Sequence, residues 1–280
     1  MTEGGSEKRE IFGLDAFSPR EVAERVETVG VAKARLPLLS MSVLGVLAGG
    51  FIGLGALYFT LIASDQALTL ALSRLLGGLV FSLGLILVVV AGAELFTGNN
   101  LLVMAWVAKR ITTTELLRNF IITYISNLVG ALGLVLLVYL SNQWAMGGGE
   151  VGLIAVRIAA YKTSLTFTEA FFKGVLCNIL VCLAVWLAMA GRSVIDKIAA
   201  IVFPISAFVA AGFEHSIANM YFIPMGILLK THYTTAKIPY IETLDLLGFA
   251  GNLVPVTLGN IIGGSVMVGL VYWLVYRRSA

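Results

Sequence analysis

Two long apolar runs, at residues 74–109 and 194–229, constrain this chain more than any other feature, because each is 36 residues long. A helix needs only about 20 residues to cross the hydrocarbon core of a bilayer. Each run carries a polar segment near its middle, at 92–100 (GAELFTGNN) and at 212–220 (GFEHSIANM). Unwound backbone at membrane depth is tolerated only where it is buried in protein or lines a water-filled cavity. The runs therefore predict two broken helices, with their breaks beside a cavity.

Four further apolar runs complete the membrane domain, at about 37–62, 115–141, 169–190 and 247–276. The whole chain is 59% hydrophobic and 12% charged, against about 25% charged residues in a soluble domain. We therefore expect an all-α membrane protein in which residues 37–276 form six transmembrane helices, the second and fifth broken. Residues 1–36 are expected to form a cytoplasmic amphipathic region and residues 277–280 a cytoplasmic tail.

The N-terminal region shows one clear helix signal, and residues 1–35 are polar, without an apolar core of the signal-peptide type, so we expect no cleavage there. Residues 18–21 (SPRE) combine an N-cap, a proline at the first helical position and an acid in the first turn. Four valines between residues 22 and 31 alternate with charges. This pattern predicts an amphipathic helix that lies on the membrane surface or packs on a neighbouring subunit, and the sequence leaves both alternatives open.

Basic residues are distributed unevenly across the expected membrane. With the N-terminus inside, 13 of the 19 Lys and Arg residues fall in cytoplasmic segments. The positive-inside rule therefore predicts a multi-pass protein of the cell (inner) membrane with both termini in the cytoplasm. The net charge of +3 is spread over segment ends, so it does not indicate nucleic-acid binding.

The two halves of the chain share three short patterns in the same order. They are Gly-Val-Leu at 45 and 174, Gly-x-Glu at 92 and 212, and Asn-x-x-Gly at 127 and 260. Their spacings of 129, 120 and 133 differ only by loop-sized amounts. A repeat with three crossings must reverse its orientation in the second copy, and inverted repeats with broken helices place the permeation site where the breaks meet. The pattern predicts a pore at that point.

Three polar residues are candidates to contact a permeating species. His215 lies at the second break, and its imidazole can donate a hydrogen bond to an anion or pass it a proton. Thr97 lies beside Gly98 at the first break, where its hydroxyl could join backbone N–H groups in an anion-coordinating loop or cap the following helix. Lys162 falls in an expected outer loop, where it would attract anions or stay solvated.

Other residues near the breaks have expected structural roles. Glu94 and Glu214 can accept hydrogen bonds from backbone N–H groups freed where a helix is broken. Three asparagines can bridge neighbouring helices: Asn127, Asn178 and Asn260. Four large apolar side chains flank the breaks and could form hydrophobic constrictions: Phe81, Leu85, Leu95 and Phe208.

The sequence offers no nucleophile–base pair and no metal-ligand cluster. We therefore expect no enzyme activity, no metal and no cofactor. Cys177 and Cys182 lie about 140° apart on one predicted helix, which favours a packing role over a disulfide.

Several of these segments together resemble the formate/nitrite transporter family. The matching stretches are 93–98 (AELFTG), 173–186, 212–220 (GFEHSIANM) and 259–264 (GNIIGG). The resemblance covers residues 20–276, and the stretch at 212–220 is highly specific. It implies an aquaporin-like protomer with an inverted 3+3 repeat, one pore per protomer, and assembly as a homopentamer. Members of this family move small monovalent anions such as formate, nitrite and hydrosulfide.

The resemblance also implies residue roles. The pore histidine falls on His215, the loop threonine on Thr97, the vestibule lysine on Lys162 and the bridging asparagine on Asn178. The inner constriction would be formed by Phe81 and Leu85, and the outer one by Leu95 and Phe208.

The leading hypothesis is a channel or proton-linked transporter for formate, in contact with membrane lipid. Nitrite or hydrosulfide transport by the same scaffold is the alternative. A haem-binding membrane subunit is a remote alternative, because haem in such a subunit needs paired axial ligands and only His215 lies within a span. An ammonium or water channel is also remote, because Lys162 favours anions.

Overall fold

The computed structural model describes residues 16–278, and the regular secondary structure in this range is helical, without a β-strand. The expected N-terminal region and C-terminal tail extend beyond it, because residues 1–15 and 279–280 lie outside the described residues. The elements, in order, are α1 Pro19–Ala34, α2 Leu38–Ala63, α3 Leu70–Phe81, α4 Leu83–Ile86, η1 Leu87–Gly92, α5 Phe96–Asn99, η2 Asn100–Leu102, α6 Val103–Val107, α7 Thr113–Leu140, η3 Gln143–Gly149, α8 Glu150–Thr163, α9 Phe167–Ala190, α10 Val194–Ala210, α11 Ser216–Leu229, η4 Lys230–Tyr233, η5 Ile241–Thr243, α12 Leu246–Ile261, η6 Ile262–Leu270 and α13 Val271–Tyr276.

Local sequence explains where several helices begin. The N-termini of α1, α7, α9 and α10 each have a reciprocal capping box, in which a Ser or Thr is followed three residues later by an acid. At α1 the acid is Glu21, whose carboxylate accepts a hydrogen bond from the backbone N–H of Ser18 at 2.7 Å. This bond lowers the pKa of the Glu21 carboxyl.

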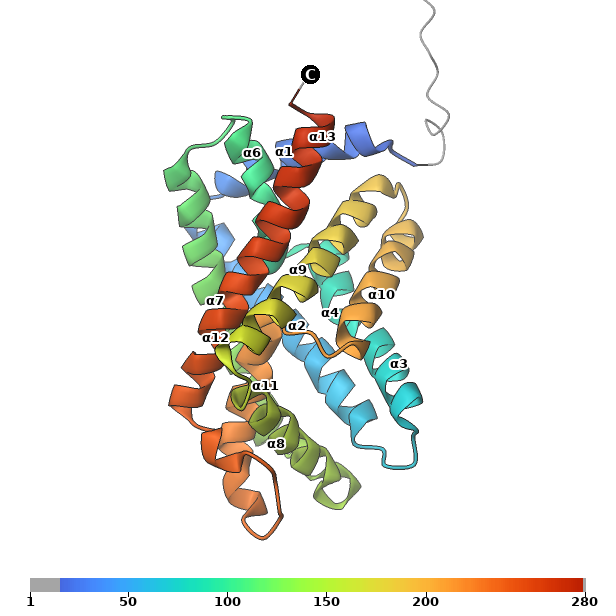
Figure 1. The fold of residues 1–280 in the computed structure, drawn as a ribbon, viewed down its shortest axis with the longest axis vertical. Coiled ribbons are helices and arrows are strands. Elements are labelled where there is room, and N and C mark those ends of the chain that lie inside the picture. Colours follow the sequence, from blue (N-terminus) through green and yellow to red (C-terminus); the bar gives the residue numbers. More distant parts are fainter. Residues whose placement is uncertain (1–15, 279–280) are drawn as a thin grey trace, which may run out of the picture.

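Among the described residues, five helical stretches are long and apolar enough to cross a membrane: Leu38–Ala63, Leu70–Gly92, Thr113–Leu140, Phe167–Ala190 and Leu246–Tyr276. The apolar run at 194–229 is divided between α10, with 17 residues, and α11, with 14. The chain is therefore an integral membrane protein. In Figure 1 the long helices follow the long axis, with α1, α6 and α13 at one end and α8 at the other. We call these the α1 end and the α8 end.

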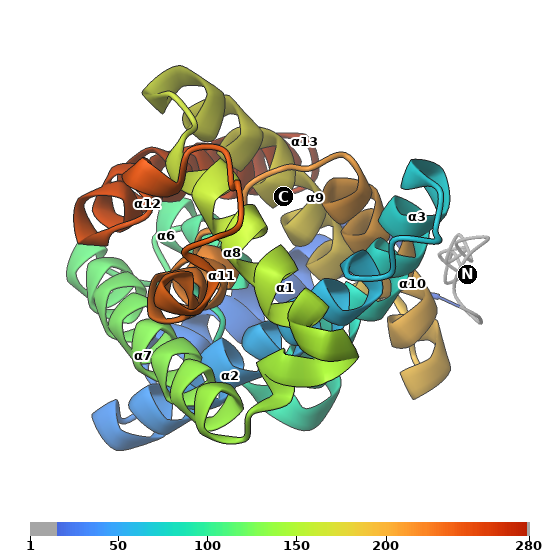
Figure 2. The ribbon, with the colours of Figure 1, turned by 90° about the horizontal axis from the view of Figure 1, so that it is seen from below.

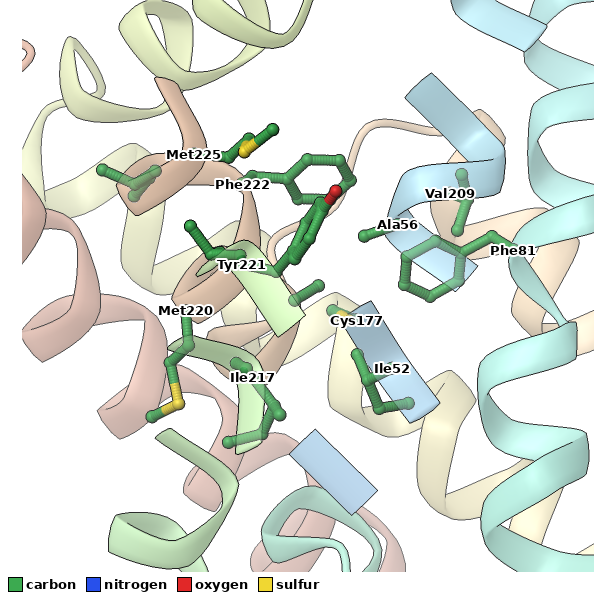
Figure 3. Packing of buried hydrophobic residues seen from close by; sticks show 14 of the residues in the cluster. Ile52, Ala56, Phe81, Cys177, Val209, Ile217, Met220, Tyr221, Phe222 and Met225 are labelled. Atoms are coloured by element: carbon green, nitrogen blue, oxygen red, sulfur yellow. The ribbon is translucent and has the colours of Figure 1, made fainter. Parts of the chain in front are cut away.

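The bundle is built from pairs of closely packed helices. α2 packs along α7, and α9 packs along α12. α11 contacts α2, α7, α8 and α12, so it lies inside the bundle (Figure 2). Its side chains make up much of the central core, where Ile217 and Tyr221 lie near Ile52 and Phe81 of the first half (Figure 3). The break that precedes α11 is therefore held deep in the protein.

Glycines allow the close approach of α2 and α7. A Cβ atom on Gly130 would meet the carbonyl oxygen of Val46, and one on Gly49 would meet that of Asn127. Gly133 lies on α7, as Gly130 does, but a Cβ atom on Gly133 would have nothing within 4 Å.

Gly130→Ala is expected to destabilise the protein by about 1–3 kcal/mol, because an added methyl group must force the two helices apart. The measurement is the midpoint of thermal unfolding in detergent. Gly133→Ala is the matched control and should leave that midpoint unchanged or raise it slightly, since alanine favours the helix. Equal midpoints for the two variants would show that the contact at Gly130 is not tight.

The surroundings of α1 differ from both alternatives drawn from its sequence. Its apolar face, which includes Val22 and Val26, is buried against the chain's own bundle, next to Leu101 and Trp186. Both predictions, a membrane surface and a neighbouring subunit, are thus wrong for this face. Sequence patterning shows that a helix has an apolar face, but not which surface covers it.

Candidate functional site

The chain leaves helical geometry at two corresponding places. α10 ends at Ala210 and α11 begins at Ser216, with Gly212 between them at φ +71°. In the first half, η1 ends at Gly92, whose φ is +88°, and α5 begins at Phe96. A left-handed φ is accessible to glycine at little cost, so both glycines mark where the chain direction changes.

We call the non-helical stretch between η1 and α5 the first interruption and that between α10 and α11 the second. Asn260 stabilises the backbone at the second interruption. Its side-chain oxygen accepts from the backbone N–H of Ser216 at 2.9 Å. Its amide nitrogen donates to the carbonyls of Gly174 at 2.8 Å and Glu214 at 3.0 Å. One side chain thus pairs a donor and an acceptor of the interruption, the Ser216 N–H and the Glu214 carbonyl, as buried backbone groups require, and ties them to α9 through Gly174.

Asn127 makes the same three contacts at the first interruption. Its oxygen accepts from the backbone N–H of Phe96 at 3.0 Å. Its amide donates to the carbonyls of Gly45 at 2.8 Å and Glu94 at 2.9 Å. The partners are related by the same spacings that relate the two halves of the sequence, so the repeat extends to individual hydrogen bonds.

A buried ion pair adjoins the second interruption. Glu214 is 2% exposed, and its Oε1 accepts from Lys162 Nζ at 2.9 Å. Lys162 lies in helix α8 and is itself buried, so the prediction that it lies in a loop is wrong. Residues 150–163 form a helix too short and too polar to cross a bilayer, which is why this stretch did not stand out from sequence.

An equivalent pair adjoins the first interruption. Glu94 Oε1 accepts from Lys33 Nζ at 2.7 Å. Lys33 belongs to α1 and was not predicted as a site residue. Its distance of 129 residues from Lys162 equals one of the repeat spacings, and this signal could have identified it.

His215 and Thr97 meet where the two halves face each other. His215 Nε2 lies 2.9 Å from Thr97 Oγ1, and both residues are buried. The backbone N–H of Ala218 donates to His215 Nδ1 at 3.1 Å. Since Nδ1 is an acceptor, the neutral ring carries its proton on Nε2 and donates to the Thr97 hydroxyl. The single N–H of His215 is therefore used by the Thr97 hydroxyl oxygen, and the Thr97 hydroxyl keeps its own O–H as a donor.

Asn178 ties this pair to α9 and α12. Its amide nitrogen donates to the carbonyls of Thr97 at 3.2 Å and Asn260 at 2.7 Å. Cys182, one helical turn further along α9, donates from Sγ to the same Thr97 carbonyl at 3.4 Å. Both Cys177 and Cys182 are buried.

Two cavities approach the histidine–threonine pair from opposite ends. A cavity of about 430 Å³ at the α8 end is lined by Lys162, Glu214 and Phe208, among others. The Phe208 ring stacks on that of His215, with centroids 5.9 Å apart. A cavity of about 500 Å³ at the α1 end is lined in part by Lys33, Glu94, Leu95 and Gly98. Because Leu95 and Gly98 flank Thr97, the pair separates the two cavities.

The apolar side chains that narrow these cavities pair differently from the prediction. Phe81 lines the α8-end cavity with Phe208, and their rings are 5.7 Å apart. Leu85 lines the α1-end cavity with Leu95. The predicted pairs, Phe81 with Leu85 and Leu95 with Phe208, are therefore wrong. Phe81 and Leu85 are four residues apart, which separates them by about 6 Å along the helix axis. They therefore face different cavities.

Both cavities are electropositive. The α8-end cavity is lined by Arg74, Arg157, Lys162 and Lys173 and by the acid Glu214. The α1-end cavity is lined by Arg25, Lys33 and Lys197 and by the acid Glu94. A cleft lined by an excess of one charge concentrates ions of the opposite sign. Within the described residues, no group of His, Cys, Asp and Glu could hold a metal ion.

An integral membrane protein with two basic cavities on either side of one buried polar pair has the architecture of a membrane channel or transporter. The chain matches the family model described as formate/nitrite transporter over residues 20–274. It belongs to the formate/nitrite transporter family, as the resemblance of its motifs predicts.

Named relatives and a solved structure support this assignment. The formate channel FocA of Escherichia coli (strain K12) is 43% identical over 275 residues, which cover 95% of this chain and 96% of the relative. FocA of Haemophilus influenzae is 42% identical, covering 91% and 93% of the two chains. A solved structure described as a pentameric formate channel with formate bound superposes with a TM-score of 0.80 at 42% identity, covering 85% of this chain and 97% of the other.

Proposed function

We propose that this protein is a channel for small monovalent anions and that formate is its substrate. The observation that carries the proposal is the buried His215–Thr97 pair, whose remaining donor, the Thr97 hydroxyl, lies between two electropositive cavities. An anion attracted by Lys162 or Lys33 would reach this pair by passing one apolar pair, Phe81 with Phe208 or Leu85 with Leu95. The relatives named as formate channels support formate as the substrate.

The proposed assembly is a homopentamer with one pore per protomer, supported by the pentameric relative. The proposed topology has six crossings in an aquaporin-like inverted repeat. One broken span runs from α3 to η1 and, after the interruption, from α5 to α6, and the other consists of α10 and α11. This adds α10 and α11, together 194–229, to the five candidate spans. Both termini would lie in the cytoplasm and the protein in the cell (inner) membrane, with the α1 end inside.

Passage is proposed to be linked to a proton. A bare anion loses its hydration at the apolar pairs, whereas a protonated acid does not carry that cost. Lys162, Thr97 and His215 would act in sequence: the first attracts the anion and the other two contact it. Glu214, Asn178 and Asn260 would hold the pore in shape through the contacts described above. No catalysis is involved in this scheme.

Wild-type proteoliposomes are expected to take up labelled formate in a saturable manner and faster at lower external pH. The measurement is uptake at two pH values, with unlabelled formate, nitrite and hydrosulfide as competitors. Formate should compete most strongly. Stronger competition by nitrite or hydrosulfide would favour the alternative substrate on the same scaffold. Uptake no faster than in protein-free liposomes would refute the proposal.

A further inference from the structure

Four side chains form a closed ring at the α8 end, which we call the α8-end ring: Lys162, Glu214, Asn219 and Asn252. Lys162 Nζ donates to Glu214 Oε1 at 2.9 Å. Asn219 Nδ2 donates to Glu214 Oε2 at 2.6 Å and to Asn252 Oδ1 at 2.7 Å. Asn252 Nδ2 then donates to the backbone carbonyl of Lys162 at 2.8 Å. The ring begins and ends on Lys162, so it holds both the backbone and the ammonium of this residue.

The α1 end has a matching ring, the α1-end ring, made of Lys33, Glu94, Asn99 and Asn119. Lys33 Nζ donates to Glu94 at 2.7 Å, and Asn99 Nδ2 donates to Glu94 at 2.7 Å and to Asn119 at 2.9 Å. Asn119 Nδ2 donates to the carbonyl of Lys33 at 3.2 Å. Each residue is related to its counterpart by one of the repeat spacings, 129, 120 or 133.

The two rings differ in one bond. Lys33 Nζ also donates to Asn99 Oδ1 at 3.1 Å. The corresponding atom at the α8 end, Asn219 Oδ1, is fully buried and has no hydrogen-bond partner among the described residues. An ammonium has three N–H donors. Lys33 therefore uses two of them inside its ring, whereas Lys162 uses one.

From this geometry we infer that Asn252 and Asn219 are positioning residues for Lys162, and that Asn119 and Asn99 are positioning residues for Lys33. Each ring fixes the ammonium at the edge of its cavity, and so sets the affinity for an anion that arrives from that end. Lys162, with more free donors, binds the anion more strongly than Lys33. This inference rests on the proposed function, because it assumes that anions enter both cavities.

Asn252 and Asn119 act only through the lysines, which gives these two asparagines a side-specific signature. Asn252 lies in α12 and Asn119 in α7, and neither is among the residues that line the two cavities. A variant that loosens one ring should weaken anion binding from that end alone. A merely structural defect should reduce the number of active channels, and so leave both half-saturating concentrations unchanged.

The test compares Asn252→Ala with Asn119→Ala in right-side-out and inverted membrane vesicles. Asn252→Ala should raise the half-saturating formate concentration from one side by roughly tenfold, the effect of losing a hydrogen bond that supports a charged group. From the other side it should change less than twofold. Asn119→Ala should show the opposite sidedness with a smaller change, because Lys33 keeps its bond to Asn99. The maximal flux from each side is not used as the readout. Because the two one-way fluxes must be equal at equilibrium, the ratio of maximal flux to half-saturating concentration is the same from both sides, so the maximal flux changes with that concentration.

Equal changes from both sides, or none from either side, would overturn the inference. If wild-type vesicles carry nitrite but not formate, the proposed substrate fails and the same comparison is made with nitrite. If an alanine variant does not assemble, Asn252→Ser and Asn119→Ser replace it. A solved structure of the Asn252 variant gives a readout that needs no transport: the Lys162 ammonium should no longer lie within hydrogen-bond distance of Glu214. An unchanged pair would overturn the positioning role.

Discussion

Replacing His215 with phenylalanine is expected to abolish the pH dependence of formate uptake while the protein still assembles. Phenylalanine preserves the ring that stacks on Phe208, but it removes both nitrogen atoms. The Nε2–H that contacts Thr97 is then lost, and with it the one ring donor between the two cavities. The measurement is uptake of labelled formate by proteoliposomes at two pH values, with the oligomer size checked in detergent.

His232 provides the matched control for this variant. It is the second of the two histidines in the chain and lies near the α8 end, where its ring packs 4.6 Å from that of Trp144. His232→Phe should keep the pH dependence of the wild type. A His215→Phe protein whose uptake still rises at low pH would rule out the proton-linked role of this histidine.

The geometry also indicates what protonation of His215 would require. A second proton must bind Nδ1, which now accepts from the Ala218 N–H and caps α11. Losing an N-cap costs about 0.5–2 kcal/mol. Two unit charges 4 Å apart attract by about 4 kcal/mol at an effective dielectric constant of 20. An anion in contact with the ring is thus able to compensate for the lost cap, which links protonation to the presence of substrate.

Much of this site was predictable because it is encoded in local patterns. The polar stretches at 92–100 and 212–220 are conspicuous inside apolar runs, and their spacing predicted that the two halves are related. His215 and Thr97 were identified in this way, and the structure brings them together.

The sequence also predicts that Glu94 and Glu214 accept from backbone N–H groups at the breaks, and this is wrong. The Glu214 carboxylate accepts from the side chains of Lys162 and Asn219, and Glu94 likewise accepts from Lys33 and Asn99.

Other features depend on contacts that no local pattern encodes. Lys33 lies in a polar helix outside the apolar runs, so the sequence predicts that it belongs to the cytoplasmic region and gives no sign that it lines a cavity. Asn119 and Asn252 lie inside apolar helices, and only the three-dimensional structure shows that they reach the backbone of a lysine. The pairing of Phe81 with Phe208 depends on the depth of each side chain in the bundle, which spacing along one helix does not give.

Replacing Glu214 with glutamine is expected to destabilise the protein by about 3–5 kcal/mol, the cost of removing one partner from a buried ion pair. Its two carboxylate oxygens accept from Lys162 and Asn219. Glutamine offers one oxygen, so one donor would face the new amide group and the Lys162 ammonium would lose its counter-charge. The measurement is the midpoint of thermal unfolding in detergent.

Glu94→Gln, the corresponding change in the first half of the chain, is the matched control and should destabilise the protein less. The side chain of its partner, Lys33, is 27% exposed, against 11% for Lys162, so water can solvate the stranded ammonium. Lys162→Met combined with Glu214→Gln should be more stable than Glu214→Gln alone, because replacing both charges leaves none unpaired. The double variant should nevertheless bind formate weakly from the α8 end, since it lacks the ammonium. A double variant no more stable than Glu214→Gln would show that Glu214 acts through Asn219 and the backbone, and not through its charge.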